Sequence, residues 1–121
     1  MIGDREETDA TVVSEITPGG VTVIRVCGDL DDDSSPALAG ALSAAAADGN
    51  CSRTVVDLST VGFADSSALH ALLTAQKAHQ AAGIVLVLAG PVQAAVDRLF
   101  EVTRTGPVFR WAESVQEGMT C

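Results

Sequence analysis

The strongest constraint on the fold is an uninterrupted apolar run, Ile-Val-Leu-Val-Leu-Ala, at residues 84–89. Gly83 precedes this run and Gly90-Pro91 follows it, so both of its ends are marked by breaker residues. The run has the length of a strand and is rich in β-branched and aliphatic residues. Because no polar residue alternates with the apolar ones, we expect both faces of the strand to be buried. This pattern predicts a central position in a parallel sheet.

The rest of the chain alternates between strand patterns and helix patterns. β-Branched runs predict further strands at residues 11–16, 21–27, 55–58 and 108–111. Apolar residues at helical spacing predict helices at residues 36–47, 65–83, 90–100 and 113–119. Repeated alternation requires crossover connections and therefore a mainly parallel sheet. We expect an α/β fold with a mixed, mainly parallel sheet of about five strands, about four helices and the order ββαβαβαβα.

Turn and cap residues set the expected boundaries of several elements. Pro18-Gly19-Gly20 makes the first two strands an antiparallel hairpin. Ser35 is the expected N-cap of the first helix, with Pro36 at its first helical position. The polar residues 1–9 are expected to form a flexible N-terminus. With 121 residues, of which 47% are apolar, the remainder at 10–121 is expected to form a single domain.

Residues 53–73 form the unit around which the chain is organised: a strand, a short loop and a helix. Asp65, Ser66 and Ser67 stand where the helix begins. The unpaired N–H groups and partial positive charge at a helix N-terminus stabilise an anion such as a phosphate. Asp and Ser are also favoured capping residues at any helix. Helix capping alone and a phosphate-bearing site are therefore both open interpretations of these residues.

The residues of this unit resemble a known motif. Asp57-Leu58-Ser59-x-Val61-x-Phe63-x-Asp65-Ser66-Ser67-x-Leu69 is similar to the phosphorylation motif of the STAS domain of anti-sigma factor antagonists. Residues 28–31, Gly-Asp-Leu-Asp, resemble the Gly-Glu-Leu-Asp segment of that family, and residues 90–100 resemble the segment before its third helix. The resemblance covers roughly residues 8–118 and implies a STAS-like fold.

The resemblance implies a binding switch that acts in transcription regulation and stress response, and not an enzyme. In this family the unphosphorylated antagonist binds an anti-sigma factor that is also a serine kinase, and a sigma factor is released. The kinase then phosphorylates the serine after the aspartate, here Ser66, and binding is lost. A serine phosphatase resets the switch. The implied partners are thus the anti-sigma factor kinase and the phosphatase, and no cofactor is implied.

The resemblance also implies which residues contact the partner: Asp31, Asp65, Ser66, Ser67 and Ala68. The sequence departs from the family pattern at the last of these positions, because Ala68 stands where the family usually has glycine. The added methyl group can narrow the approach of a partner's backbone.

Charge and cysteine content exclude several other functions. The net charge of −9 opposes binding to nucleic acid or to anionic membranes, and favours a basic protein partner. Cys27, Cys51 and Cys121 are far apart and form no metal-ligand spacing, so a zinc site is not expected. Cys27 lies in a strand pattern and is expected in the core. With no secretory or membrane-spanning pattern, the protein is expected in the cytoplasm.

Other chemistries can be drawn from the sequence. A hydrolase could use Ser66 and His70, which are four residues apart, together with Asp57 or Asp65. Both histidines, however, fall at helix positions expected to face solvent, and no nucleophile-elbow motif is present. The acidic residues 29, 31 and 33 alternate as at the start of a calcium-binding loop, but the glycine and glutamate that such a loop needs are missing.

A non-switching scaffold is the main alternative from another functional class. STAS domains also occur in stressosome-like assemblies and as small subunits of lipid-transport ATPases. In such a protein, residues 65–67 would only cap the helix, and a scaffold of the transporter kind would never carry phosphate on Ser66. The presence or absence of that phosphate distinguishes the two functions.

Overall fold

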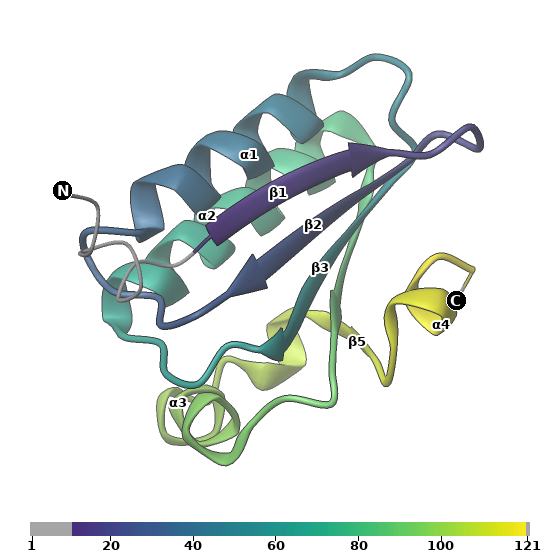
Figure 1. Cartoon of the computed structure of the whole chain (residues 1–121). Helices are drawn as coiled ribbons and strands as arrows, with labels where there is room; N and C mark the ends of the chain where they lie inside the picture. The colour runs from purple at the N-terminus through teal and green to yellow at the C-terminus, as the bar shows by residue number, and fades with distance from the viewer. Residues whose placement is uncertain (1–10, 121) are drawn as a thin grey trace, which may run out of the picture.

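The computed structural model describes residues 11–120 (Figure 1). Its strands are β1 (Thr11–Ile16), β2 (Val21–Cys27), β3 (Arg53–Thr60), β4 (Val85–Ala89) and β5 (Arg110–Ala112). Its helices are α1 (Ser35–Ala47), α2 (Ser66–Ala82), α3 (Ala94–Thr103), the 3-10 helix η2 (Gly106–Val108) and α4 (Val115–Gly118). The predicted α/β order is confirmed. The predicted flexible segment 1–9 lies outside the described residues.

The strands form one five-stranded sheet in the order β1-β2-β3-β4-β5. β1 and β2 are antiparallel, as expected of a hairpin, and the other neighbours are parallel because a helix connects them. β4 has a strand on each side, and residues 86–89 are buried, as the apolar run predicted. No helix within residues 11–120 has both the length and the apolar character needed to cross a bilayer.

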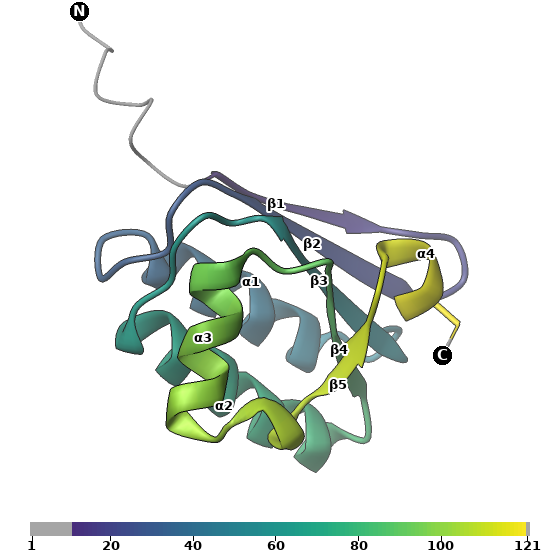
Figure 2. The same cartoon turned by 90° about the horizontal axis from the view of Figure 1, so that it is seen from below.

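The two faces of the sheet are covered unequally (Figures 1 and 2). α1, α2 and α3 lie on one face, where Leu38, Leu72 and Phe100 join the large core cluster. The short α4 lies on the other face, over a smaller cluster that includes Val55 and Val87. β2, β3 and β4 are largely covered, whereas five of the six residues of β1 and two of the three residues of β5 are exposed.

The structure corrects several sequence predictions. α1 begins at Ser35 with Ser34 at the capping position, because the Ser34 hydroxyl bonds within the preceding loop. α3 begins at Ala94, not at residue 90, since Gln93 is still extended (ψ 159°) and its side chain donates to the Ser59 carbonyl oxygen (3.4 Å). Cys27 is exposed and not in the core, because it lies on the same face of β2 as the exposed Arg25, whereas Val26 between them is buried.

His79 also differs from its predicted place at the surface, because it is fully buried at the end of α2. Its Nδ1 donates to the Ala75 carbonyl oxygen (2.8 Å), and its Nε2 accepts from the Thr54 hydroxyl on β3 (2.9 Å). Burial lowers the pKa of His79, since the interior disfavours the charged imidazolium. The ring therefore joins helix α2 to the centre of the sheet.

Candidate functional site

The candidate site consists of two loops at the carboxyl ends of β2 and β3. The Leu30 N–H donates to the Phe63 carbonyl oxygen (2.8 Å), and the Asp65 N–H donates to the Leu30 carbonyl oxygen (3.0 Å). These bonds form an isolated parallel bridge between Leu30 and Ala64. The loop that carries Asp31 is thereby held against the loop that leads into α2. Residues 31 and 65–67, separated by more than thirty positions, share one region of the surface.

Asp65 caps α2 and sets the charge at its N-terminus. Its Oδ1 accepts from the Ser67 N–H (2.9 Å), the Ala68 N–H (3.2 Å) and the Ser67 hydroxyl (2.5 Å). The hydrogen bond from the Ser67 hydroxyl, aided by those two N–H groups, lowers the pKa of Asp65 below its usual value. Asp65 therefore places a stable negative charge beside Ser66.

The two adjacent serines have different surroundings. The Ser67 hydroxyl is half-buried, donates to Asp65 and lies 3.2 Å from the Ser35 hydroxyl of α1. Ser66 is exposed, and its hydroxyl has no hydrogen-bond partner among residues 11–120. An incoming reactant can reach Ser66 without breaking any contact, whereas Ser67 would have to leave two partners.

Ala68 lies inside the molecule. It is 0% exposed and belongs to the large core cluster beneath the N-terminus of α2. Its methyl group therefore does not alter the surface that a partner would meet. That Ala68 contacts a partner stays a prediction, but its buried side chain is not accessible for such a contact.

Asp31 is partly exposed, and one of its carboxylate oxygens is used within its own loop. Its Oδ1 accepts from the N–H groups of Asp33 and Ser34 and from the Ser34 hydroxyl, all at 3.1 Å. Asp31 thus orders the loop before α1, and its second oxygen is not held in this way. The carboxylates of Asp31, Asp32 and Asp33 come within 4.8 Å of one another, but acidic side chains on a surface loop often do so without a metal.

Phe63 is a site residue to which the sequence analysis gave no role. It is 48% exposed, in the loop directly before Asp65 and Ser66. The chain has only three phenylalanines, and the other two are buried. An exposed aromatic beside a polar site is a common anchor for a protein partner. The sequence did hold a signal for this exposure. Phe63 falls in a predicted loop, whereas an aromatic residue of the core normally lies in a helix or strand.

The two carboxylates proposed for a hydrolase are both engaged by other groups. Asp57 Oδ1 accepts from the Ser59 N–H (3.0 Å) and the Ser59 hydroxyl (2.7 Å), and Asp57 Oδ2 lies 3.5 Å from Arg25 Nη1. Asp65 is engaged by Ser67. Neither carboxylate orients an imidazole, which a Ser-His-Asp triad requires.

Comparison with known families identifies one match over most of the chain. Residues 14–107 match the family model described as "Mlab, STAS domain". No curated protein matched the sequence.

Solved structures with the same fold include several antagonists. An anti-sigma factor antagonist from Mycobacterium paratuberculosis has a TM-score of 0.80 and 26% identity, with 92% of each chain covered. The antagonist SpoIIAA in its unphosphorylated form has a TM-score of 0.77 and 20% identity, with 90% of this chain and 93% of that chain covered. Bacillus SpoIIAA in its phosphorylated form has a TM-score of 0.71 and 19% identity, with 90% of this chain and 96% of that chain covered. The predicted STAS-like fold is confirmed.

Proposed function

Because this chain belongs to the STAS-domain family, we propose that it is an anti-sigma factor antagonist that is switched off by phosphorylation of Ser66. The unphosphorylated form binds an anti-sigma factor serine kinase, and a sigma factor is released. The kinase phosphorylates Ser66, the complex dissociates, and a serine phosphatase restores the active form. The similarity to the mycobacterial antagonist supports this general role.

The observation that carries the proposal is the contrast between Ser66 and Ser67. Ser66 is exposed and unbonded within residues 11–120, at the N-terminus of a 17-residue helix. Phosphate adds about −1.5 to −2 charges at neutral pH. The N-terminal N–H groups of α2 stabilise that charge, so the fold is retained. A partner docked over this end of α2 would have to remove water from the phosphate beside Asp65, and would therefore be released.

The partner surface that we propose combines this acidic end of α2 with one apolar anchor. Asp31, Asp65, Ser66 and Ser67 supply the polar part, and Phe63 supplies the anchor. The Ala68 side chain is not included, because it is buried. Such a surface suits a partner with basic residues around an apolar pocket.

Site-resolved mass spectrometry tests the phosphorylation step. ATP is added to a native lysate that contains the protein, or its Ser66→Ala or Ser67→Ala variant. We expect one phosphate on Ser66 in the wild type and in Ser67→Ala, and none in Ser66→Ala. A phosphate that maps to Ser67, or that persists in Ser66→Ala, would contradict the site assignment.

A matched pair of substitutions tests whether charge causes release. Ser66→Asp and Ser66→Asn have nearly the same size, but only the first adds a negative charge. Using the complex captured with unphosphorylated protein, we expect Ser66→Asp to bind at least tenfold more weakly than Ser66→Asn, a difference of about 1.4 kcal/mol. Equal binding of the two folded variants would show that release does not depend on charge.

One observation favours a second candidate function. The matching family model carries the name Mlab and not that of an antagonist. In this alternative the chain is a non-switching scaffold subunit, stressosome-like or accessory to lipid transport, in which residues 65–67 only cap α2. A stable partner that co-purifies with protein never phosphorylated under any growth condition would favour the scaffold.

A further inference from the structure

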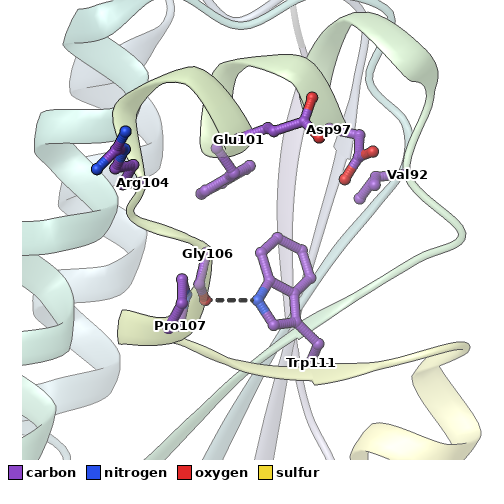
Figure 3. A pocket seen from close by; sticks show the side chains of 8 residues that line it. Val92, Asp97, Glu101, Arg104, Gly106, Pro107 and Trp111 are labelled. Atoms are coloured by element: carbon purple, nitrogen blue, oxygen red, sulfur yellow. Dashed lines mark hydrogen bonds between the residues drawn. The ribbon is translucent and has the colours of Figure 1, made fainter.

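A separate groove lies between α3, η2 and β5, and the residues that line it do not include Ser66 (Figure 3). It encloses about 600 Å³. Its walls combine apolar and charged side chains: Val92, Asp97, Phe100, Glu101, Arg104 and Trp111, with Gly106 and Pro107 at one end. Trp111, the largest residue of the groove, keeps part of its side chain accessible. Core packing alone therefore does not explain why these residues lie together.

Trp111 is fixed in position but not covered. Its Nε1–H donates to the Gly106 carbonyl oxygen (2.8 Å), and its ring meets the Phe100 ring edge-on with centroids 4.9 Å apart. The residue nevertheless stays 37% exposed. In Figure 3 the indole ring projects into the groove. A rigid aromatic surface that is already oriented can bind a planar or cationic group with little loss of side-chain entropy.

Two carboxylates line the same groove on its α3 side. Asp97 and Glu101 are one turn apart on α3, and Figure 3 shows both carboxylates on the same side of the groove. The ion pairs among residues 11–120 both involve Arg25, so neither carboxylate is neutralised by one. Arg104, which also lines the groove, points its guanidinium away from the two carboxylates.

We propose that this groove binds an arginine side chain of a protein partner. A guanidinium is planar, stacks on an indole face and pairs with carboxylates, and these are the groups that Trp111, Asp97 and Glu101 present. Phosphate-bearing ligands are repelled by the two carboxylates, and the net charge of −9 attracts a basic surface. This inference does not depend on phosphorylation at Ser66.

Trp111 is the chain's single tryptophan, so its fluorescence reports directly on the groove. We would titrate the full chain with a capped glycine–serine peptide that contains one arginine. Matched peptides carry citrulline, which has the same shape without charge, or lysine. We expect the arginine peptide to change the Trp111 fluorescence in a saturable way, with a dissociation constant of the order of 1 mM. The lysine peptide should bind more weakly, and the citrulline peptide should not bind.

Two variants test the role of the carboxylates. Asp97→Asn and Glu101→Gln should each weaken binding of the arginine peptide by about threefold, as expected for exposed charge pairs. Glu113→Gln removes the same charge outside the groove and should leave binding unchanged. Equal binding of the citrulline peptide, or equal affinity in all three variants, would overturn the proposal. Guanidinium chloride that binds as tightly as the peptide would overturn the assignment to a protein partner.

Discussion

Ser66 and Ser67 are neighbours with the same chemistry, and their surroundings alone distinguish them. The Ser67 hydroxyl is held by Asp65 and lies beside that of Ser35, whereas the Ser66 hydroxyl is exposed. The sequence placed both at the start of a helix, but it could not show which hydroxyl would be engaged. That choice depends on α1, which brings Ser35 to Ser67 from a distant part of the chain.

The capping carboxylate of Asp65 should make stability depend on pH. Its pKa is lowered in the folded state, so its contribution is present above the unfolded value, near 3.8, and is lost as the pH falls through the folded value. Asp65→Ala should lower the free energy of unfolding by about 1 kcal/mol at pH 7. Asp65→Asn retains a capping oxygen, so its free energy of unfolding should fall less than that of Asp65→Ala. Urea unfolding at pH 7 measures both, and equal losses would contradict a role for the capping oxygen.

At the level of elements, local patterns predicted most of the fold. The strand at the apolar run 84–89, the helix that begins at residues 65–67 and its end at Gly83 were predicted from the sequence, because each depends on neighbouring residues. The predictions that were wrong concern side chains whose surroundings depend on residues distant in the sequence. His79 was expected at the surface, since the polar residues around it suggest an exposed face, but Thr54 of β3 gives its ring a partner. The burial of Ala68 was likewise not visible in the sequence, because it depends on the packing of α2 against the large core cluster.

The His79 link between α2 and β3 should weaken in mild acid. The lowered pKa means that the unfolded chain takes up the proton more readily, so stability is intact above about pH 6.5 and declines as the pH falls below it. We expect the urea midpoint to drop between pH 7.5 and pH 5.5. His79→Gln should be less stable at pH 7.5 but should show a smaller drop. The control His70→Gln changes a histidine at an exposed position of the same helix, and its urea midpoint should fall as much as that of the wild type. A smaller fall in His70→Gln would contradict the assignment of the pH effect to His79.

Restoring the family's usual glycine at position 68 should affect stability and not phosphorylation. Ala68→Gly removes a buried methyl group and adds backbone freedom to α2, which together cost about 1–2 kcal/mol. Ala78→Gly, at an exposed position of the same helix, should lower the free energy of unfolding only through the poorer helix propensity of glycine, by about 1 kcal/mol. Urea unfolding gives the costs, and the rate of Ser66 phosphorylation is measured in parallel. Faster phosphorylation of folded Ala68→Gly would return Ala68 to the partner surface.

The whole molecule carries 16 acidic and 7 basic residues. Within residues 11–120, the ion pairs are those of Arg25 with Glu15 and Asp57, so few of the charges in this part of the chain are paired. A compact chain with a large net charge is destabilised by its own repulsion. The acidic surface thus favours basic partners at a cost in stability.

Salt should therefore stabilise the protein. Raising NaCl from about 10 to 150 mM shortens the screening length from roughly 30 to 8 Å. We expect the unfolding temperature to rise by a few degrees over this range. Thermal unfolding followed by circular dichroism measures it, with an equal osmolarity of sucrose as the control. A fall in the unfolding temperature with salt would mean that attractive pairs outweigh the repulsion.

The unbonded hydroxyl of Ser66 has a consequence for how such a molecule would be regulated. Because the fold does not use this hydroxyl, the modified and unmodified proteins would share one shape and nearly one stability. Neither form would be preferred by the chain itself. The ratio of the two would then be set by the opposing rates of the kinase and the phosphatase, and it would change as fast as those enzymes do. A protein built this way would register the balance of two enzyme activities in its cell.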